Sequence, residues 1–262
     1  MRWFDIGVNL LDRRINNNDV LQRSLQAGVD HLCIISSNLA ESQNAQSFVS
    51  SSTSKIHLSY TAGIHPHCAD AASAADFTKI KTLCADKTMV AVGECGLDFN
   101  RNFSTKQNQL RVFESQLEIA AEYAKPIYLH EREAFDEQVE LLERYLAHIP
   151  RAVVHCFTGS QSQLKTYLEL GCYIGITGWL CDDKRASELQ EAILSLPLDR
   201  LLLETDAPYL FPKNVRPRAK NNEPCYLPHI AQRYAELTQY EINDIAQASY
   251  RNAKAFFGLD TS

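Results

Sequence analysis

The chain has 262 residues, of which 45% are hydrophobic and 22% are charged. These values are typical of an ordinary globular protein, and they exclude a disordered chain. No apolar run reaches the roughly 20 residues that a bilayer-spanning helix needs. A formal net charge of −6 argues against a protein that coats nucleic acid through a global positive field, although it permits a locally basic cleft.

The N-terminus and the cysteines both indicate a reducing compartment. Asp5 stands where a signal peptide would continue its apolar region, so we expect a cytoplasmic protein without a secretion signal. The eight cysteines contain no C-x-x-C pair, and several lie inside apolar runs, as Cys33 does. We therefore predict reduced thiols buried in the core.

In chain order, strand-like apolar runs alternate with helical patterns, which predicts βα units and a parallel sheet. Eight runs have the composition of strands: Trp3–Asp5, His31–Ile34, Leu58–Tyr60, Met89–Ala91, Pro126–Tyr128, Ala152–Val154, Cys172–Ile174 and Arg200–Leu202. Seven segments have helical periodicity: Val20–Ala27, Gln109–Tyr123, Ala134–Leu146, Gln163–Leu170, Glu188–Leu194, Leu227–Leu237 and Glu241–Phe257. The proline-rich stretch from Pro208 to Pro224 follows the last strand, where a barrel carries an active-site loop.

Four of the strand-like runs lead into a residue that can bind a metal, namely Glu94, His130, His155 and Asp206. In an open sheet a site gathers between neighbouring strands, whereas residues from the fourth, fifth, sixth and eighth strands converge easily only if the sheet closes. We therefore predict a single (β/α)8 TIM-barrel domain over residues 1–262. These four side chains would lie at its C-terminal rim, where barrel enzymes carry their active sites.

Two carboxylates and two imidazoles in such positions indicate a divalent metal ion, because buried groups of this kind cost free energy without partners. Alternation along each strand predicts that Val90, Val92 and Glu94 share one face, as do Val153 and His155. The mixed ligands do not identify the ion. Carboxylates suit Mg²⁺ and Mn²⁺, whereas imidazoles are equally suited to Zn²⁺.

Basic and aromatic residues gather around the predicted rim. His65 follows the third strand and is placed to bind a substrate phosphate or donate a proton, and Arg101 and Arg132 are predicted to bind substrate. Further cations and aromatic residues share these loops: Lys184, Arg185, Lys213, Arg216, Arg218 and Lys220, with Phe99, Phe103, Phe157, Trp179 and Tyr209. Such a mixture suits single-stranded nucleic acid, because cations contact phosphates while aromatic rings stack on bases.

Three motifs, Gly93–Asp98, His155–Gly159 and Glu204–Leu210, resemble the TatD family of metal-dependent deoxyribonucleases, and the likeness extends along essentially the whole chain. The resemblance implies a (β/α)8 barrel and a magnesium- or manganese-assisted 3'-to-5' exonuclease. Its substrates would be single-stranded DNA and also RNA, and its role would be DNA repair in the cytoplasm. Glu94, His130 and His155 match the family's metal ligands, and Asp206 matches its essential aspartate.

One departure from the wider family concerns the first strand. Most relatives carry His-x-His after the first-strand aspartate, whereas this chain has Gly7 and Asn9. Neither residue supplies an imidazole, so we expect one firmly held ion, with any second ion recruited by the substrate phosphate. Asp206 would then orient or deprotonate the attacking water, while His65 and a rim arginine would offset the phosphate charge.

Two other functions fit the same residues. An amidohydrolase-like esterase, lactonase or deacylase would use the same barrel mouth, and fold and ligands alone do not separate it from a nuclease. A non-catalytic barrel scaffold would fit the absent imidazoles at Gly7 and Asn9. Metal dependence separates the scaffold from both enzymes, and assays on oligonucleotides and simple esters separate the enzymes. We expect a monomer.

Overall fold

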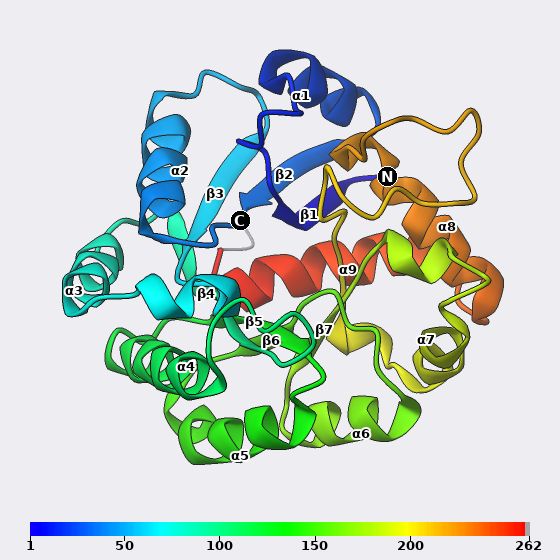
Figure 1. Ribbon diagram of the computed structural model, residues 1–262. Helices are drawn as coiled ribbons and strands as arrows, with labels where there is room; N and C mark the ends of the chain where they lie inside the picture. The colour runs from blue at the N-terminus through cyan, green and yellow to red at the C-terminus, as the bar shows by residue number, and fades with distance from the viewer. Residues whose placement is uncertain (260–262) are drawn as a thin grey trace.

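The computed structural model describes residues 1–259, in which eight parallel strands form one sheet in the order β1 to β8. Figure 1 shows this sheet curled into a barrel with helices around it. The strands are β1 (Trp3–Val8), β2 (Val29–Ile34), β3 (His57–Ala62), β4 (Met89–Asp98), β5 (Ile127–Arg132), β6 (Ala152–Val154), β7 (Tyr173–Ile176) and β8 (Leu201–Leu203). The predicted barrel architecture is confirmed.

The helices include two that the sequence patterns did not predict, α2 and α3. The α-helices are α1 (Asn17–Gln26), α2 (Leu39–Ser51), α3 (Ala74–Leu83), α4 (Lys106–Glu122), α5 (Phe135–Tyr145), α6 (Gln161–Glu169), α7 (Ser187–Ala192), α8 (Leu227–Leu237) and α9 (Ile242–Phe257). A 3₁₀ helix, η1 (Pro66–Ala71), follows β3. The seven predicted helices are present, with their ends shifted by a few residues.

Closure of the barrel between β8 and β1 depends on the segment that follows β8. Val8 and Ala207 form an isolated parallel bridge, and the backbone amide of Asp206 donates to the carbonyl of Gly7 over 2.9 Å. The buried Asp5 carboxylate accepts the backbone amide of Thr205 at 2.9 Å and its hydroxyl at 2.5 Å. These contacts fix the backbone on both sides of Asp206.

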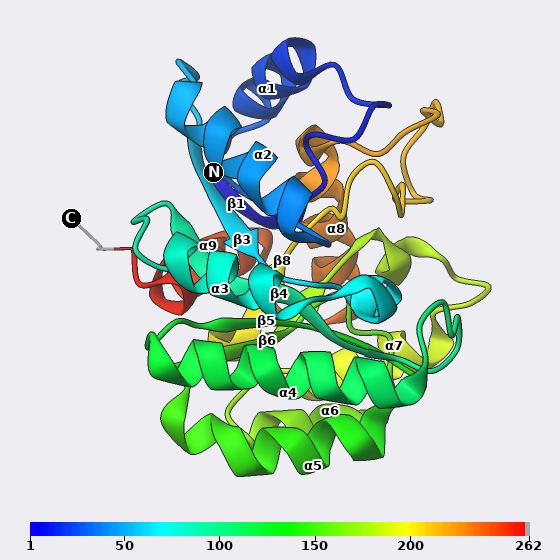
Figure 2. The same cartoon turned by 60° about the vertical axis from the view of Figure 1, so that its left-hand side comes forward.

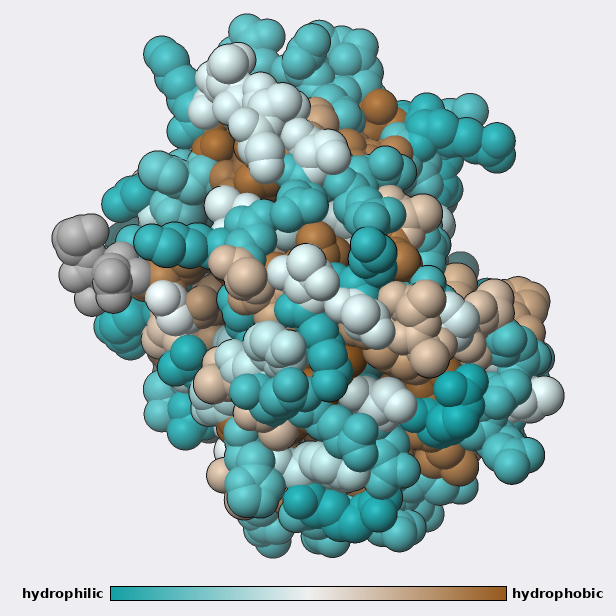
Figure 3. All heavy atoms as spheres, turned by 90° about the vertical axis from the view of Figure 1, so that its left-hand side faces the viewer, coloured by the Kyte–Doolittle hydropathy of each residue, from teal (hydrophilic) through white to brown (hydrophobic). Residues whose placement is uncertain are grey.

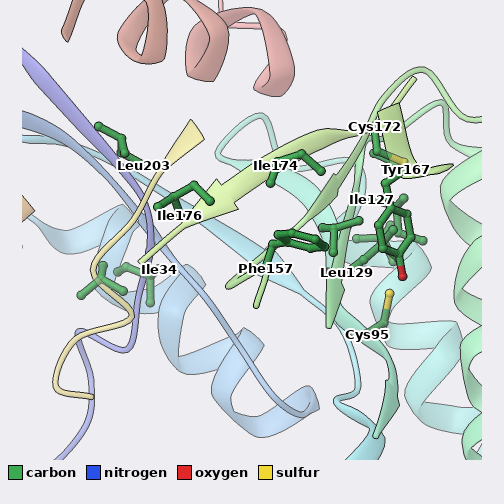
Figure 4. Packing of buried hydrophobic residues seen from close by; sticks show 14 of the residues in the cluster. Ile34, Cys95, Ile127, Leu129, Phe157, Tyr167, Cys172, Ile174, Ile176 and Leu203 are labelled. Atoms are coloured by element: carbon green, nitrogen blue, oxygen red, sulfur yellow. The ribbon is translucent and has the colours of Figure 1, made fainter. Parts of the chain in front are cut away.

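Two apolar layers hold the barrel together. Phe4, Ile6, Tyr128, Val153 and Leu202 pack inside the sheet. The second layer lies between the sheet and its helices, and Figure 4 shows part of it, including Ile127, Leu129, Ile174 and Ile176. Because the interior is filled by side chains, the barrel is a packed core rather than a pore.

The prediction that Val90, Val92 and Glu94 share one face was wrong for Val92. Val90 packs in the interior cluster, but Val92 packs in the outer layer. The register of β4 shifts between Tyr60 and Thr61 on its β3 side and between Val92 and Cys95 on its β5 side, so simple alternation fails along this strand.

The C-terminal helix α9 covers the N-terminal end of the barrel. Phe256 and Phe257 pack with the interior cluster, and the rings of Phe257 and Phe4 are 5.5 Å apart. Figure 2 shows the end of α9 on the opposite side of the molecule from the loop after β8. The two ends of the barrel therefore differ, since α9 packs against one and the functional loops surround the other.

The surface and the thiols agree with the composition. On the face shown in Figure 3, hydrophilic residues cover most of the surface, and hydrophobic residues appear in patches between them. All eight cysteines are free, as predicted. No helix within residues 1–259 combines the length and apolar character that a membrane crossing requires.

Candidate metal centre at the mouth of the barrel

The centre of the site is one carboxylate oxygen surrounded by imidazoles. Oε1 of Glu94 lies 2.8 Å from Nε2 of His155, 3.1 Å from Nδ1 of His130 and 3.3 Å from Nε2 of His65. Glu94 lies within β4 and His130 within β5, whereas His155 directly follows β6 and His65 immediately precedes η1. Four separate segments therefore converge on one point, as a closed sheet requires.

Close backbone packing beneath Glu94 explains a glycine in this region. A Cβ on Gly63 would lie 2.5 Å from the Cα of Gly93, so only glycine permits this approach of the chain after β3 to β4. The same segment carries His65 two residues later. The backbone approach therefore brings the His65 imidazole to the Glu94 carboxylate.

A buried carboxylate orients His155. Oε2 of Glu204 lies 3.4 Å from Nδ1 of His155 and accepts a hydrogen bond from the hydroxyl of Tyr128, while Oε1 accepts the backbone amide of Cys156 at 2.5 Å. Glu204 is fully buried. A carboxylate behind one ring nitrogen fixes the imidazole so that the other nitrogen faces the site, which is the usual arrangement behind a metal-binding histidine.

A second carboxylate connects His130 to His67. Oδ2 of Asp98 lies 2.7 Å from Nε2 of His67 and 3.5 Å from Nε2 of His130. Sequence reasoning did not single out Asp98 as a site residue. The strand β4 continues four residues beyond Glu94, so Asp98 reaches the same rim. The predicted strand, Met89–Ala91, ended before Glu94.

The protonation of Glu94 is set by its neighbours. Burial alone would raise its pKa, but the positive charges of His155 and His65 and the hydrogen bond with His130 hold the pKa of Glu94 well below its usual range. Glu94 is therefore a carboxylate at neutral pH. An ionised oxygen among imidazoles is the donor chemistry that a divalent cation uses.

Asp206 has a different environment. Burial raises the pKa of Asp206 to about 7, the charge of His155 opposes this shift, and the charges of Glu94 and Glu204 add to it. The amide Nδ2 of Asn9 donates to Oδ1 of Asp206 over 3.0 Å. Asn9 therefore helps to position the aspartate.

Unpaired nitrogens show that these residues fit a metal ion. Nε2 of His130 and Nε2 of His155 are buried, and neither makes a hydrogen bond with another group in residues 1–259. Donor atoms of His65, Glu94 and His130 lie within 4.8 Å of one another. Buried imidazole nitrogens without partners are costly unless a ligand binds them.

The structure places the predicted metal ligands as follows. Glu94, His130 and His155 converge, and Asp206 lies beside them, held by Asn9. His65, which the sequence suggested as a phosphate-binding residue, belongs to the same cluster. The signal for His65 was available only as a histidine following the third strand, and its contact with Glu94 depends on tertiary packing.

The predicted rim residues are only partly available to a ligand. Arg101 and Arg132 are exposed and form no ion pair with any residue in 1–259. Arg185 and Lys213, in contrast, both pair with Asp182, at 2.5 and 2.6 Å. Arg101 and Arg132 are therefore stronger candidates for contact with phosphates than Arg185 and Lys213. Lys184, Arg218 and Lys220 are likewise exposed and form no ion pair within residues 1–259.

The aromatic residues at the rim also divide into two groups. Phe103 is 65% exposed and Tyr209 is 47% exposed, so their rings are accessible for stacking. Phe99 and Phe157 are buried, and the prediction that they line the rim as stacking surfaces was wrong. Phe157 packs against Tyr167 in the layer beneath the helices (Figure 4).

Comparisons with known proteins agree with this geometry. A family model described as TatD related DNase matches residues 4–258. The chain is 46% identical to the "3'-5' ssDNA/RNA exonuclease TatD" of Klebsiella pneumoniae (strain 342), with 99% of each chain covered. It is 44% identical to the protein of the same name from Erwinia amylovora, with 98% of this chain and 100% of that protein covered.

Solved structures share the fold over the same extent. The TatD homologue YJJV from Escherichia coli K12 has a TM-score of 0.88 and 27% sequence identity, and the match covers 99% of this chain and 98% of that chain. A TatD family hydrolase from Entamoeba histolytica has a TM-score of 0.89 at 24% identity, with 98% of each chain covered.

Proposed function

The chain belongs to the family of TatD-related DNases, and from this premise we propose that it is a metal-dependent 3'-to-5' exonuclease acting on single-stranded DNA and on RNA. One observation carries the proposal: three imidazoles surround one oxygen of Glu94 at the barrel mouth, and two of their nitrogens lack hydrogen-bond partners within the described residues. The reaction is hydrolysis of phosphodiester bonds.

Glu94, His130, His155 and Asp206 would hold the ion, and His65 adjoins the same donors. The ion, Mg²⁺ or Mn²⁺ in our proposal, supplies Lewis-acid chemistry by offsetting phosphoryl charge and making water more acidic, and Zn²⁺ fits the imidazoles as well. Glu204 holds the ring of His155 in place from behind.

The protein's own groups would perform the remaining steps. Asp206, whose pKa is near 7, is suited to orient the attacking water and to accept its proton. The exposed guanidinium groups of Arg101 and Arg132 would hold the phosphates of the strand. Phe103 and Tyr209 present rings to the bases without selecting a sequence.

An esterase, lactonase or deacylase would need the same ion but a different rim. Unpaired arginines and exposed aromatic rings favour a phosphodiester polymer over a small neutral ester. A direct comparison of an oligonucleotide with simple esters tests this alternative, and ester hydrolysis without oligonucleotide hydrolysis would refute the nuclease. We expect the protein to act as a cytoplasmic monomer in DNA repair.

The test of the proposal is a pair of substitutions in the centre. In Glu94→Gln and Asp206→Asn, we expect hydrolysis of an end-labelled single-stranded oligonucleotide to fall by about 10²-fold or more, because a ligand or the proton acceptor is lost. Labelling opposite ends of the strand reports the direction of degradation.

The matched control is Glu133→Gln, which also removes a carboxylate near the rim. Glu133 is exposed and accepts a hydrogen bond from Asn100, outside the cluster. Activity of this variant should stay near that of the unmodified protein. Undiminished hydrolysis by either centre variant would refute the assignment of that residue.

A further inference from the structure

The geometry points to a second ligand site, for a nucleoside monophosphate, at the N-terminal end of the barrel. This site lies at the opposite end of the strands from the metal centre. Its assignment does not depend on the function proposed above. It consists of a cavity of about 470 Å³ at the starts of β1 to β4 and the end of α9. Six of the residues that line the cavity carry the argument: Arg2, His31, His57, Lys87, Val90 and Lys254.

The cavity exists because α9 covers the end of the barrel unevenly. Its aromatic residues Phe256 and Phe257 pack against Phe4 of β1 and Tyr173 of β7. The starts of β2, β3 and β4 are left beside the helix, and they line the cavity. A hollow of this volume lies within the range of roughly 300–1,000 Å³ that small-molecule sites occupy.

The positively charged side chains that line the cavity favour an anionic ligand. Three cationic side chains, Arg2, Lys87 and Lys254, line it, and no carboxylate among residues 1–259 does. Within residues 1–259, Lys87 and Lys254 form no ion pair, whereas Arg2 pairs with Asp30 at 2.6 Å. In a chain of net charge −6, unpaired lysines around one hollow attract a phosphate, which accepts charge-assisted hydrogen bonds.

The imidazoles beside these cations favour a nucleotide over a bare phosphate. The rings of His31 and His57 stack with centroids 4.4 Å apart and 27° between their planes. Nδ1 of His31 is fixed by Asp30 at 2.9 Å and by the hydroxyl of Tyr250 at 3.1 Å, while His57 is exposed. A fixed aromatic surface gives a base a place to stack, and the buried Val90 adds apolar contact.

The experiment is calorimetric titration of the full chain with dAMP in EDTA, since removal of metal weakens phosphate binding at the barrel mouth. We expect one saturable site. The double variant Lys87→Ala/Lys254→Ala should weaken binding by about tenfold or more, because each lysine contributes a charge-assisted hydrogen bond. Inorganic phosphate should bind at least several-fold more weakly than dAMP, because it cannot stack.

Two controls locate the site. Lys79→Ala/Lys165→Ala removes the same charge from α3 and α6, and Arg101→Ala/Arg132→Ala removes two unpaired cations of the mouth; neither should change dAMP binding. The imidazole proton resonances of His31 and His57 should shift on addition of dAMP. If the double variant fails to fold, Lys87→Gln and Lys254→Gln provide the same comparison singly.

Several results would overturn the proposal. They are absence of saturable binding in EDTA, unchanged affinity in the lysine variants, equal affinity for phosphate and dAMP, or loss of binding in the mouth variant. A chain ending at Leu259 tests the last three residues as a competing occupant. A tenfold gain of affinity on this truncation would show that the chain's own end fills the cavity, which also contradicts the proposal.

Discussion

At the scale of single residues, the Tyr128 hydroxyl supplies a hydrogen bond to the buried carboxylate of Glu204. Tyr128 and Glu204 are both fully buried, and the hydroxyl donates to the carboxylate that orients His155. Tyr128→Phe removes only this donor and leaves a buried carboxylate short of one hydrogen bond. We expect the free energy of unfolding to fall by about 1–3 kcal/mol, measured by urea denaturation.

The matched control for this variant is Tyr145→Phe. Its hydroxyl also donates to a carboxylate, that of Glu114 at 3.1 Å, but near the surface. The control should change stability by no more than about 0.5 kcal/mol. Equal effects of the two substitutions would contradict the role assigned to Tyr128.

Sequence patterns predicted the kind of site, a metal centre, better than they predicted which residues form it. Glu94, His130 and His155 each follow an apolar run, so their convergence could be predicted from the sequence alone. His65 and Asp98 could not be assigned in this way. His65 lies in an irregular segment, and Asp98 belongs to a strand whose register shifts, so neither position follows from a period of two.

At the scale of elements, the loops after β4 and β8 carry the exposed rings of the rim. Phe103 lies in the first loop, with its ring 4.8 Å from that of His67, and Tyr209 lies in the second, where Arg14 stacks on it at 4.4 Å. We expect Phe103→Ala and Tyr209→Ala each to raise the KM for a single-stranded oligonucleotide on the order of tenfold, with little change in kcat.

Steady-state kinetics on an oligonucleotide long enough to reach both loops would check this prediction. Tyr123→Ala is the control, because Tyr123 is 39% exposed at the end of α4 and takes no part in the rim. A loss confined to kcat would show that the two rings act on the reaction step rather than on strand binding.

The two unpredicted helices show the limits of periodicity. In α2 only Ser42 and Ala45 are buried, so the helix has no apolar stripe to recognise. The sequence nevertheless marks the start of α2, because the side chain of Asn38 accepts a hydrogen bond from the backbone amide of Glu41. Likewise, Ser73 and Asp76 form a capping box at the start of α3. Caps alone could have predicted both helices.

At the scale of the whole molecule, the packed interior separates the two ends of the barrel. Phe4, Ile6, Tyr128 and Leu202 fill the space between the metal centre and the cavity beside α9. A nucleic acid strand therefore has no path through the barrel and must enter and leave on the face that carries the rim. The net charge of −6 disfavours binding of the strand over most of the remaining surface, so its binding should depend on the rim cations and weaken with salt.

The metal centre also couples ligand binding to the stability of the entire fold, because its residues come from segments spread over most of the chain. A divalent ion that binds only the folded state at 100 times its Kd stabilises that state by about 2.7 kcal/mol. For a chain of this length, we expect Mn²⁺ to raise Tm by roughly 5–10 °C over the value in EDTA. Thermal unfolding followed by circular dichroism measures this shift. It should be much reduced in Glu94→Gln and retained in Glu133→Gln, whereas equal shifts in the two variants would place the ion outside the cluster around Glu94.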